Sequence, residues 1–248
     1  MSLQNRNTLK NFFRKGQMPS EVHFTDLIDS VVNKVDDGLT KTLDDGLMLS
    51  PMGASKKLLS FFKSIEDKNP AWSVEIDSGN ANLDFNNHLG ESVLSLQIDG
   101  NVGVQTRTPQ YELDVNGFIG SKGRLGTYKK GKVLGDGKWH PILSDLTGCH
   151  SFEVSAGIGK KKTGKYALIH ANAISTFGKS RPKITINQGY YGTRCNKIEM
   201  RWTGTTYAYQ LEMRTRCNYE GEYYIQYYIA SLWNDETMEN SLGIDGIE

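Results

Sequence analysis

Cysteine, proline and long apolar runs are all scarce in this sequence. Its 248 residues include only three cysteines and six prolines. An odd number of widely spaced cysteines excludes a scaffold held by several disulfides and the paired spacing of a zinc site, so we interpret Cys149, Cys195 and Cys217 as reduced, buried thiols. No stretch approaches the roughly 18 consecutive apolar residues of a membrane span, and the N-terminus reaches charged residues before any run that suits a signal peptide. We therefore expect assembly in the cytoplasm, no signal peptide and no membrane span.

The composition is nevertheless that of a chain that folds. Hydrophobic residues make up 38% and aromatic residues 10%, which differs from both collagen-like and disordered sequences. The net charge of +1 hides a strong segmentation. One Arg stands against seven Asp or Glu in residues 72–121, whereas residues 122–234 contain 18 Lys or Arg against seven Asp or Glu. Such blocks favour electrostatic contacts between subunits or between parts of an assembly.

These changes along the chain divide it into five parts. We predict an N-terminal helical anchoring region (1–71), a fibre-like β oligomerisation segment (72–121), a linker (122–138), a C-terminal β-sandwich domain (139–234) and an acidic tail (235–248). The predicted fold is mainly β, with short N-terminal helices, a fibre-like β middle segment and a C-terminal antiparallel β-sandwich or jelly roll.

Two short amphipathic helices are predicted near the N-terminus. Asn7 can cap the first, which ends before Gly16, and Ser20 can cap the second, which we extend to Asp36. Their apolar faces would anchor the chain to a partner. The anchoring residues selected on this basis are Leu9, Phe12, Phe13, Leu27, Ile28 and Val31.

The segment that follows the helices has mixed signals. Asp-Asp-Gly-Leu occurs twice, starting at Asp36 and Asp44, and each copy predicts a tight turn. Residues 57–65 fit a helix and a strand, and we favour a helix.

Strands dominate from Trp72 onward. Short runs of period two alternate with Gly-Asn, Asn-Asn, Asp-Gly and Asn-Gly pairs up to residue 121, and strands this short need a partner chain or an adjoining domain. Residues 122–138 are rich in Gly and Lys, as linkers are. Beyond Trp139, six or seven longer alternating runs predict the antiparallel sandwich.

The sequence contains no residue spacing typical of a known catalytic, metal-binding or phosphate-binding motif. The five histidines lack the i, i+4 spacing of a zinc helix, and the glycine-rich segments lack the spacing of a phosphate-binding loop. Cys149 and His150 would point to opposite faces of a strand, and we interpret His170 as a hydrogen-bonded core residue because its strand is apolar. The paired aspartates lie in turns, without the pocket that would raise the pKa of one of them. We predict no enzymatic activity, no cofactor and no bound metal.

Tyrosine and tryptophan alternate with arginine between residues 190 and 228. Tyr and Arg are enriched at protein interfaces, and both also stack on sugars and single-stranded nucleic acid. We favour an interface over plain core packing and place sugar or nucleic acid last, and the absence of a nucleic-acid motif argues against a nucleic-acid partner. The candidate contact surface comprises Tyr190, Tyr191, Arg194, Trp202, Tyr207 and Tyr209.

The segment DGNVGVQTRTPQYELDVNG, residues 99–117, resembles a recurring motif of bacteriophage tail fibres, in which a Gly-Asn-Val-Gly-Ile-Gly turn leads through a Pro to a Leu-Asp-Val-Asn-Gly strand. It departs from the motif at Val104 and Gln105, and at Arg107 in place of a small polar residue. An ordinary hairpin and strand within one chain is the alternative reading. The matching residues assigned to oligomerisation are Gly100, Asn101, Val102, Gly103, Pro109, Leu113, Val115 and Gly117.

More broadly, the order of helices, fibre-like middle and C-terminal domain is similar to proteins of bacterial contractile injection systems, which are phage tail-like particles. The resemblance implies a structural role as terminal cap adaptor or tail fibre. The implied partners are further copies of the chain, as a trimer or hexamer, and tube, sheath or cap proteins, in a particle that is released extracellularly. The alternative is an adhesin that recognises a cell-surface receptor or glycan.

Overall fold

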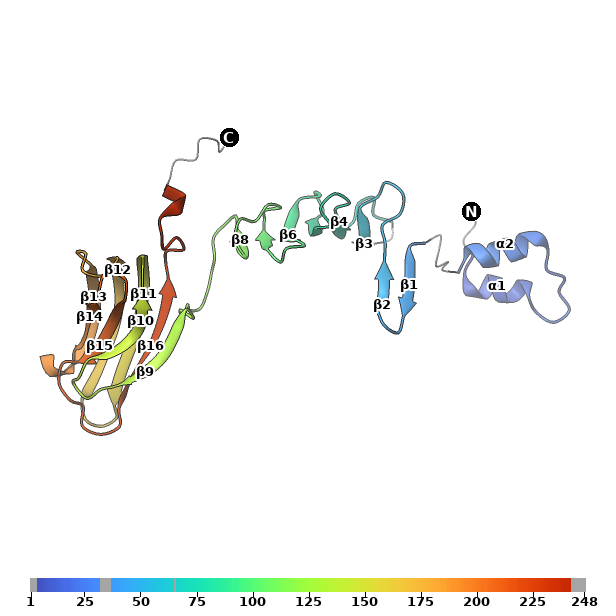
Figure 1. Cartoon of the computed structure of the whole chain (residues 1–248). Coiled ribbons are helices and arrows are strands. Elements are labelled where there is room, and N and C mark those ends of the chain that lie inside the picture. The colour runs from blue at the N-terminus through green and yellow to red at the C-terminus, as the bar shows by residue number, and fades with distance from the viewer. Residues whose placement is uncertain (1–3, 32–36, 65, 242–248) are drawn as a thin grey trace. The chain divides into compact units, whose positions relative to one another are not determined.

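The computed structural model describes residues 4–31, 37–64 and 66–241. The chain forms two compact units, Met1–Gly120 and Ser121–Glu248, which we describe separately. Figure 1 labels most of their helices and strands, numbered in chain order. The described part of the chain is mainly β, with two short α-helices, as the sequence predicts.

The two N-terminal helices form where the sequence supplies capping groups. Helix α1 spans Arg6–Phe12, and the side chain of Asn5 accepts hydrogen bonds from the amides of Asn7 and Thr8, both at 3.0 Å. Asn7 is therefore not the cap, because Asn5, two residues earlier, accepts from the free amides at the start of the helix. Helix α2 spans Glu21–Asp29, and the Ser20 amide donates to Nδ1 of His23 at 3.2 Å. The helix ends at Asp29, so the predicted extension is wrong for Ser30 and Val31, and the rest of it up to Asp36 lies outside the described residues.

A two-stranded hairpin follows the helices. Strands β1 (Leu39–Thr42) and β2 (Gly46–Leu49) are antiparallel, so the second Asp-Asp-Gly-Leu repeat does form a turn. The Asp45 amide donates to the Thr42 hydroxyl at 2.9 Å, and Gly46 has a φ of +69° that favours glycine. The first repeat begins at Asp36, which lies outside the described residues.

A six-stranded sheet completes the first unit (Figure 1). Neighbouring strands pair in chain order, all antiparallel except the parallel last pair. Its strands are β3 (Lys57–Phe61), β4 (Trp72–Ile76), β5 (Leu83–Asn87), β6 (Ser92–Leu96), β7 (Val102–Val104) and β8 (Leu113–Val115). The prediction of a helix for residues 57–65 is therefore wrong. The periodicity of this segment fits a helix and a strand equally well, and its pairing with β4 makes it a strand.

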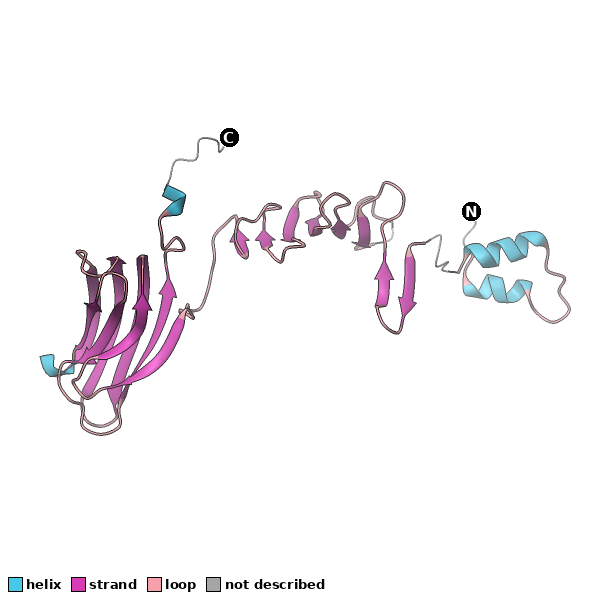
Figure 2. Ribbon diagram, viewed as in Figure 1, coloured by secondary structure: helices cyan, strands magenta, loops and turns pink. Residues whose placement is uncertain are grey.

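The second unit is an antiparallel sandwich of two sheets (Figure 2). One sheet has five strands in the order β13-β12-β11-β16-β9, and the other has three in the order β10-β15-β14. The strands are β9 (Lys129–Leu134), β10 (His140–Leu146), β11 (Cys149–Lys160), β12 (Lys165–Thr176), β13 (Lys183–Tyr191), β14 (Ile198–Gly204), β15 (Tyr209–Thr215) and β16 (Tyr224–Ser231). Two 3-10 turns, η1 (Arg194–Asn196) and η2 (Glu239–Ser241), lie outside the sheets.

Strand β9 lies inside the segment that the sequence assigns to a linker. Its lysines face solvent along the sheet edge, whereas Gly131 and Val133 point inward opposite Tyr227 and Ile225 of β16. A side chain at position 131 would collide with the Tyr227 ring, so any other residue there has to displace that ring. A segment rich in lysine and glycine suggests a linker, but here it forms an edge strand. Lysines on an edge strand disfavour its pairing with another chain.

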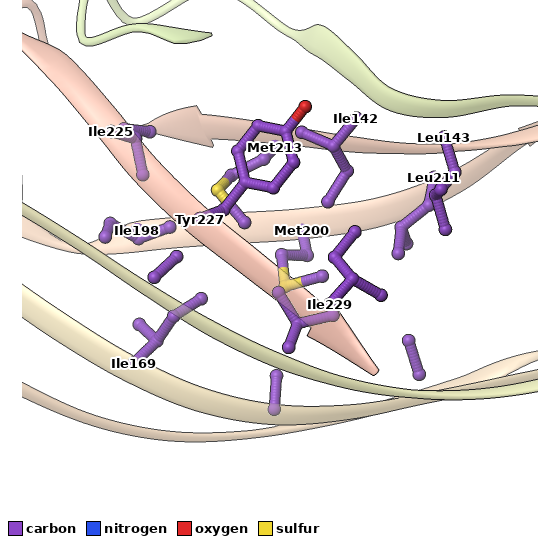
Figure 3. Packing of buried hydrophobic residues seen from close by; sticks show 14 of the residues in the cluster. Ile142, Leu143, Ile169, Ile198, Met200, Leu211, Met213, Ile225, Tyr227 and Ile229 are labelled. Carbon is purple, nitrogen blue, oxygen red and sulfur yellow. The ribbon is translucent and has the colours of Figure 1, made fainter. Parts of the chain in front are cut away.

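The hydrophobic core lies between the two sheets of the sandwich (Figure 3). Alternate residues of β11 and β12 are buried, with small alanines such as Ala171 and Ala173 allowing the opposite sheet to approach. That sheet contributes Leu211 and Met213, which are fully buried. His170 is not a core residue: its side chain is 50% exposed on the outer face of β12, where Nε2 lies 2.8 Å from Oε1 of Glu153.

Cys195 and Cys217 form a disulfide across 22 residues, and Cys149 is buried and free. The prediction of three reduced thiols is therefore wrong for two of them. The pairing of β14 with β15 starts opposite Ile198 and Thr215, which places the cysteines that flank these strands side by side. That proximity comes from strand pairing and cannot be read from a spacing of 22.

Two buried tyrosines predict an alkaline limit to the stability of the sandwich. Burial raises the pKa of Tyr209 and of Tyr219 to about 12 from the usual 10.0. The unfolded state therefore loses these protons first, and stability falls as the pH rises from 10 towards 12. We expect the free energy of unfolding at pH 11 to be about 3 kcal/mol lower than at pH 9, at about 1.4 kcal/mol per tyrosine. Urea titration with tyrosinate absorbance would measure this, and equal free energies at the two pH values would contradict it.

Candidate interaction surfaces

The described residues of the first unit form no hydrophobic core like that of the second unit. All members of the one buried hydrophobic cluster belong to the sandwich, and Val74 is the only buried hydrophobic residue described before residue 121. Other buried residues of the middle sheet are polar, among them Ser73, Asn86 and Ser95. The six-stranded sheet therefore forms a single layer. One of its faces is apolar and the other is polar.

One face of this sheet is apolar across all six strands. The strand register aligns side chains into two ladders, which we call the apolar face. The first ladder is Leu59, Val74, Phe85, Leu94, Val104 and Val115, and the second is Ile76, Leu83, Leu96, Val102 and Leu113. Leu113 is 61% exposed, and most of the others are half-buried. No described helix or strand packs on this face as a second layer.

The opposite face is polar, and the chain's own crossover segment, residues 105–112, lies against part of it. The crossover follows from the parallel pairing of β7 with β8, which a tight turn cannot connect. At Gly103 the Thr106 carbonyl approaches so closely that no Cβ would fit. Pro109 in the same segment is also buried. The chain thus covers part of its polar face by itself, and its described elements place no second layer on the apolar face.

Arg107 holds the crossover in place. Its Nη2 donates to Oδ1 of Asn86 and to the carbonyl of Gly90, both at 3.3 Å, and its Nε lies 3.6 Å from Oδ2 of Asp84. Oδ1 of Asp84 and Nδ2 of Asn86 have no described partner. The residue that departs from the fibre motif therefore has an intrachain role, which the sequence comparison alone does not indicate.

The fibre-motif residues occupy the last two strands and their turns. Gly100 has a φ of +100° in the turn before β7, and Asn101 accepts a hydrogen bond at its carbonyl from Gln97 at 2.9 Å. Val102, Leu113 and Val115 belong to the apolar face. Gly117 donates to the Val115 carbonyl at 3.0 Å. The motif thus forms turns and strands within one chain, and its role in oligomerisation stays a prediction.

The predicted anchoring residues divide into two groups. Leu9, Phe12 and Leu27 are half-buried in the helical pair, where the Phe12 ring stacks on His23 with centroids 4.1 Å apart. Phe13, Ile28 and Val31 are exposed. Phe24, which was not selected from the sequence, is also exposed one helical turn before Ile28. These exposed side chains form a second uncovered apolar surface, the helix surface Phe13, Phe24, Ile28 and Val31.

The candidate contact surface of the sandwich does not form one patch. Tyr190, Tyr191 and Arg194 lie at the end of β13 and in η1. Trp202 lies near the end of β14, Tyr207 in the turn to β15 and Tyr209 at the start of β15, which is the other end of the β14 strand. Tyr209 is only 1% exposed and donates from its hydroxyl to the Gly148 carbonyl at 2.8 Å, so it cannot contact a protein partner directly.

A small cavity lies where Trp202 and Tyr209 meet the loop after β12. Its volume is about 180 Å³, and its lining includes Ser175, Lys179 and Thr203. Sequence reasoning missed this cavity, because its walls come from two loops more than 20 residues apart. The exposed aromatic ring of Tyr207 packs edge-on against Phe177 nearby, with centroids 6.0 Å apart.

Polar clusters elsewhere on the sandwich are ion pairs of the outer sheet face. Arg124 donates to both oxygens of Glu153, at 2.8 and 2.6 Å. Hydrogen bonding to His170 and then to Arg124 lowers the pKa of Glu153. His150 is buried, with its Nε2 2.9 Å from the Thr147 carbonyl. No group of three or more His, Cys, Asp or Glu in the described ranges is placed to hold a metal ion, and none of the described helices is long and apolar enough to cross a membrane.

Comparison with known proteins adds no assignment to these surfaces. The sequence matches no protein-family model, and no curated protein is similar to it.

Proposed function

We propose that this protein is a non-enzymatic structural component of a phage tail-like contractile particle, as a cap adaptor or tail fibre. Its N-terminal helices attach to the tube or sheath end, and copies of the chain assemble through the apolar face of the middle sheet. The observation that carries the proposal is that face: two apolar ladders, six strands wide, with no second layer from the described chain.

A single-layer sheet with one apolar face needs a second layer, because burial of that face is what stabilises a sheet. The two ladders hold eleven apolar side chains. Only Leu59 and Leu113 of these are exposed and Val74 is already buried, so covering the apolar face contributes on the order of 5 kcal/mol per protomer. Association costs roughly 4–15 kcal/mol in lost freedom, so stable assembly needs most of the face to be covered. A second or third copy offers an apolar face of the same length.

The composition of the two faces supports self-assembly over binding of an unrelated chain. The acidic residues of this segment, such as Glu75, Asp84 and Asp114, alternate with the ladder residues and so lie on the other face. Assembly through the apolar face therefore buries none of them and keeps like charges apart. The fibre-motif resemblance of residues 99–117 points the same way, to a trimer or hexamer.

Attachment to a particle can be tested by sedimentation from the native host. We expect the tagged chain to sediment with tube and sheath proteins, and the double variant Phe24→Ser/Ile28→Ser to leave that fraction while keeping its oligomeric mass. Leu43→Ser, a change of similar chemistry at an exposed residue of the β1–β2 turn, is the matched control and should still sediment. A wild-type chain that sediments only as its own oligomer would contradict the particle role.

A second candidate function, binding of a cell-surface receptor or glycan, is favoured by the cavity beside Trp202. The cavity is independent of the middle sheet, because it lies within the second unit. The two functions are compatible in one fibre protein.

A further inference from the structure

In the described part of the second unit, the sandwich has four edge strands, and β13 is the longest of them. The edges are β9 and β13 in the five-stranded sheet and β10 and β14 in the three-stranded sheet. Strand β13 has nine residues, whereas the other three have six or seven. An edge strand carries backbone N–H and C=O groups that no neighbouring strand of its sheet pairs, so it can pair with a strand of another chain.

Three of these edges carry features that disfavour pairing with another chain. Three of the six residues of β9 are lysines. Strand β10 contains Pro141, and its pairing with β15 has two register shifts. Strand β14 carries Glu199 and Arg201, which form ion pairs with β15. Charged side chains, proline and bulges are the features by which natural proteins protect a sheet edge.

Strand β13 has almost none of this protection. Its sequence, KITINQGYY, has a charge only at the first residue, Lys183, and its pairing with β12 continues over nine residues without a register shift. Isoleucine, threonine and tyrosine, which favour strands, make up most of the rest. Among the described residues, only β12 contributes backbone hydrogen bonds to residues 183–190. Of the four edges, β13 is therefore the one that is open to pairing.

The sequence of β13 is complementary to itself in the antiparallel direction. Two copies that overlap over all nine residues are related by a two-fold axis at the central residue, Asn187. Ile184 then lies opposite Tyr190 of the second copy, and a pair of a β-branched and an aromatic residue stabilises antiparallel strands. Lys183 lies opposite Tyr191, so the two lysines are at opposite ends of the pair and do not repel each other.

The same register continues the core-facing side of one sheet into that of the other. Ile184 and Ile186 pack against the hydrophobic core. Their partners in the second copy are Tyr190 and Gln188, which share the face of these isoleucines because side chains alternate along a strand. The two five-stranded sheets therefore join as one continuous sheet. Tyr190 and Tyr191, which the sequence analysis selects as contact residues, both lie in this pair.

We propose that β13 is a second self-association site, at which the sandwiches of two copies pair edge to edge in the antiparallel direction around Asn187. A two-fold contact cannot close a ring of three, so it joins copies from different trimers and, combined with three-fold assembly, gives a hexamer. Three such contacts between two trimers strengthen one another. The inference goes beyond the proposed assembly through the apolar face, because β13 belongs to the other unit and pairs through backbone hydrogen bonds.

Disulfide trapping in the full-length protein tests the pairing and its register. Residue 187 lies opposite itself, and directly opposite residues have Cα atoms roughly 4.5–5.5 Å apart, within the range of a disulfide. Under a mild oxidant, we expect Asn187→Cys to form at least ten-fold more covalent dimer than Thr185→Cys. Thr185 is the matched control, because it is also exposed on the same face of β13 but lies opposite Gly189. A mixture of Thr185→Cys and Gly189→Cys should crosslink.

Hydrogen exchange gives a second measurement on the unsubstituted protein. The amides of residues 183–191 that point away from β12 should exchange at least ten-fold more slowly as the protein concentration is raised. Asn187→Lys places two lysines opposite each other and should remove this protection. Equal crosslinking of Asn187→Cys and Thr185→Cys, or none of either, would overturn the pairing. Protection of the middle sheet without protection of β13 would also overturn it, and would leave assembly through the apolar face standing.

Discussion

Replacing Leu94 by Asp is expected to weaken self-association of the full chain at least 100-fold. Leu94 stands in the middle of the first ladder, paired with Phe85 on one side and Val104 on the other. A carboxylate there would be buried by the partner copy without a counter-charge, which costs several kcal/mol. In the separated chain the same carboxylate faces solvent. We therefore expect the variant to lose self-association while the strands of its middle sheet stay folded. Analytical ultracentrifugation across a concentration series measures the dissociation constant.

The control for this variant is Leu89→Asp. Leu89 is exposed in the turn between β5 and β6. The substitution therefore makes the same change of leucine to aspartate, but outside the apolar face. Its dissociation constant should equal that of the wild type. If Leu94→Asp and Leu89→Asp associate equally well, the apolar face is not the interface.

Removing the disulfide is expected to lower the free energy of unfolding of the sandwich by about 3 kcal/mol, which corresponds to a melting temperature roughly 10 °C lower. The bond closes a loop of 22 residues that contains β14 and β15. Next to it, the Tyr219 hydroxyl donates to the Asn196 carbonyl at 2.8 Å, and the Cys217 amide donates to the Cys195 carbonyl at 3.1 Å. The bond therefore restrains a segment that is already well ordered, and its main effect is on the unfolded chain.

The variant Cys195→Ser/Cys217→Ser should have the same melting temperature as the wild type treated with a reductant, and calorimetry of both samples measures this. Cys149→Ser is the control, since that cysteine is buried and free. Equal melting temperatures with and without reductant would contradict a stabilising disulfide. Because disulfides persist in oxidising surroundings, the sandwich should be more stable there than in a reducing compartment.

Where a pattern is local, the sequence predicts the structure well. The strict alternation of β11 and β12 is visible in the letters, and both strands are among the longest of the sandwich. The Ser20 cap and the turn at Gly46 were also predicted, because a cap or a tight turn depends on a few neighbouring residues.

Features that depend on distant pairing were not predictable. Residues 57–61 form a strand only because β4 lies beside them, and residues 129–134 join the sheet through β16, which is about 90 residues away. The disulfide and the cavity depend on the same kind of proximity. His170 was misplaced because alternation shows which residues share a face and does not show which face is inside.

The most direct test of the proposed assembly is the mass of the wild-type protein in dilute solution. One chain has a mass of 27.8 kDa. We predict a mass three or six times that value by light scattering at micromolar concentration, with the middle sheet protected from hydrogen exchange. A monodisperse protein with the mass of one chain, fully folded from β3 to β8, would contradict the account.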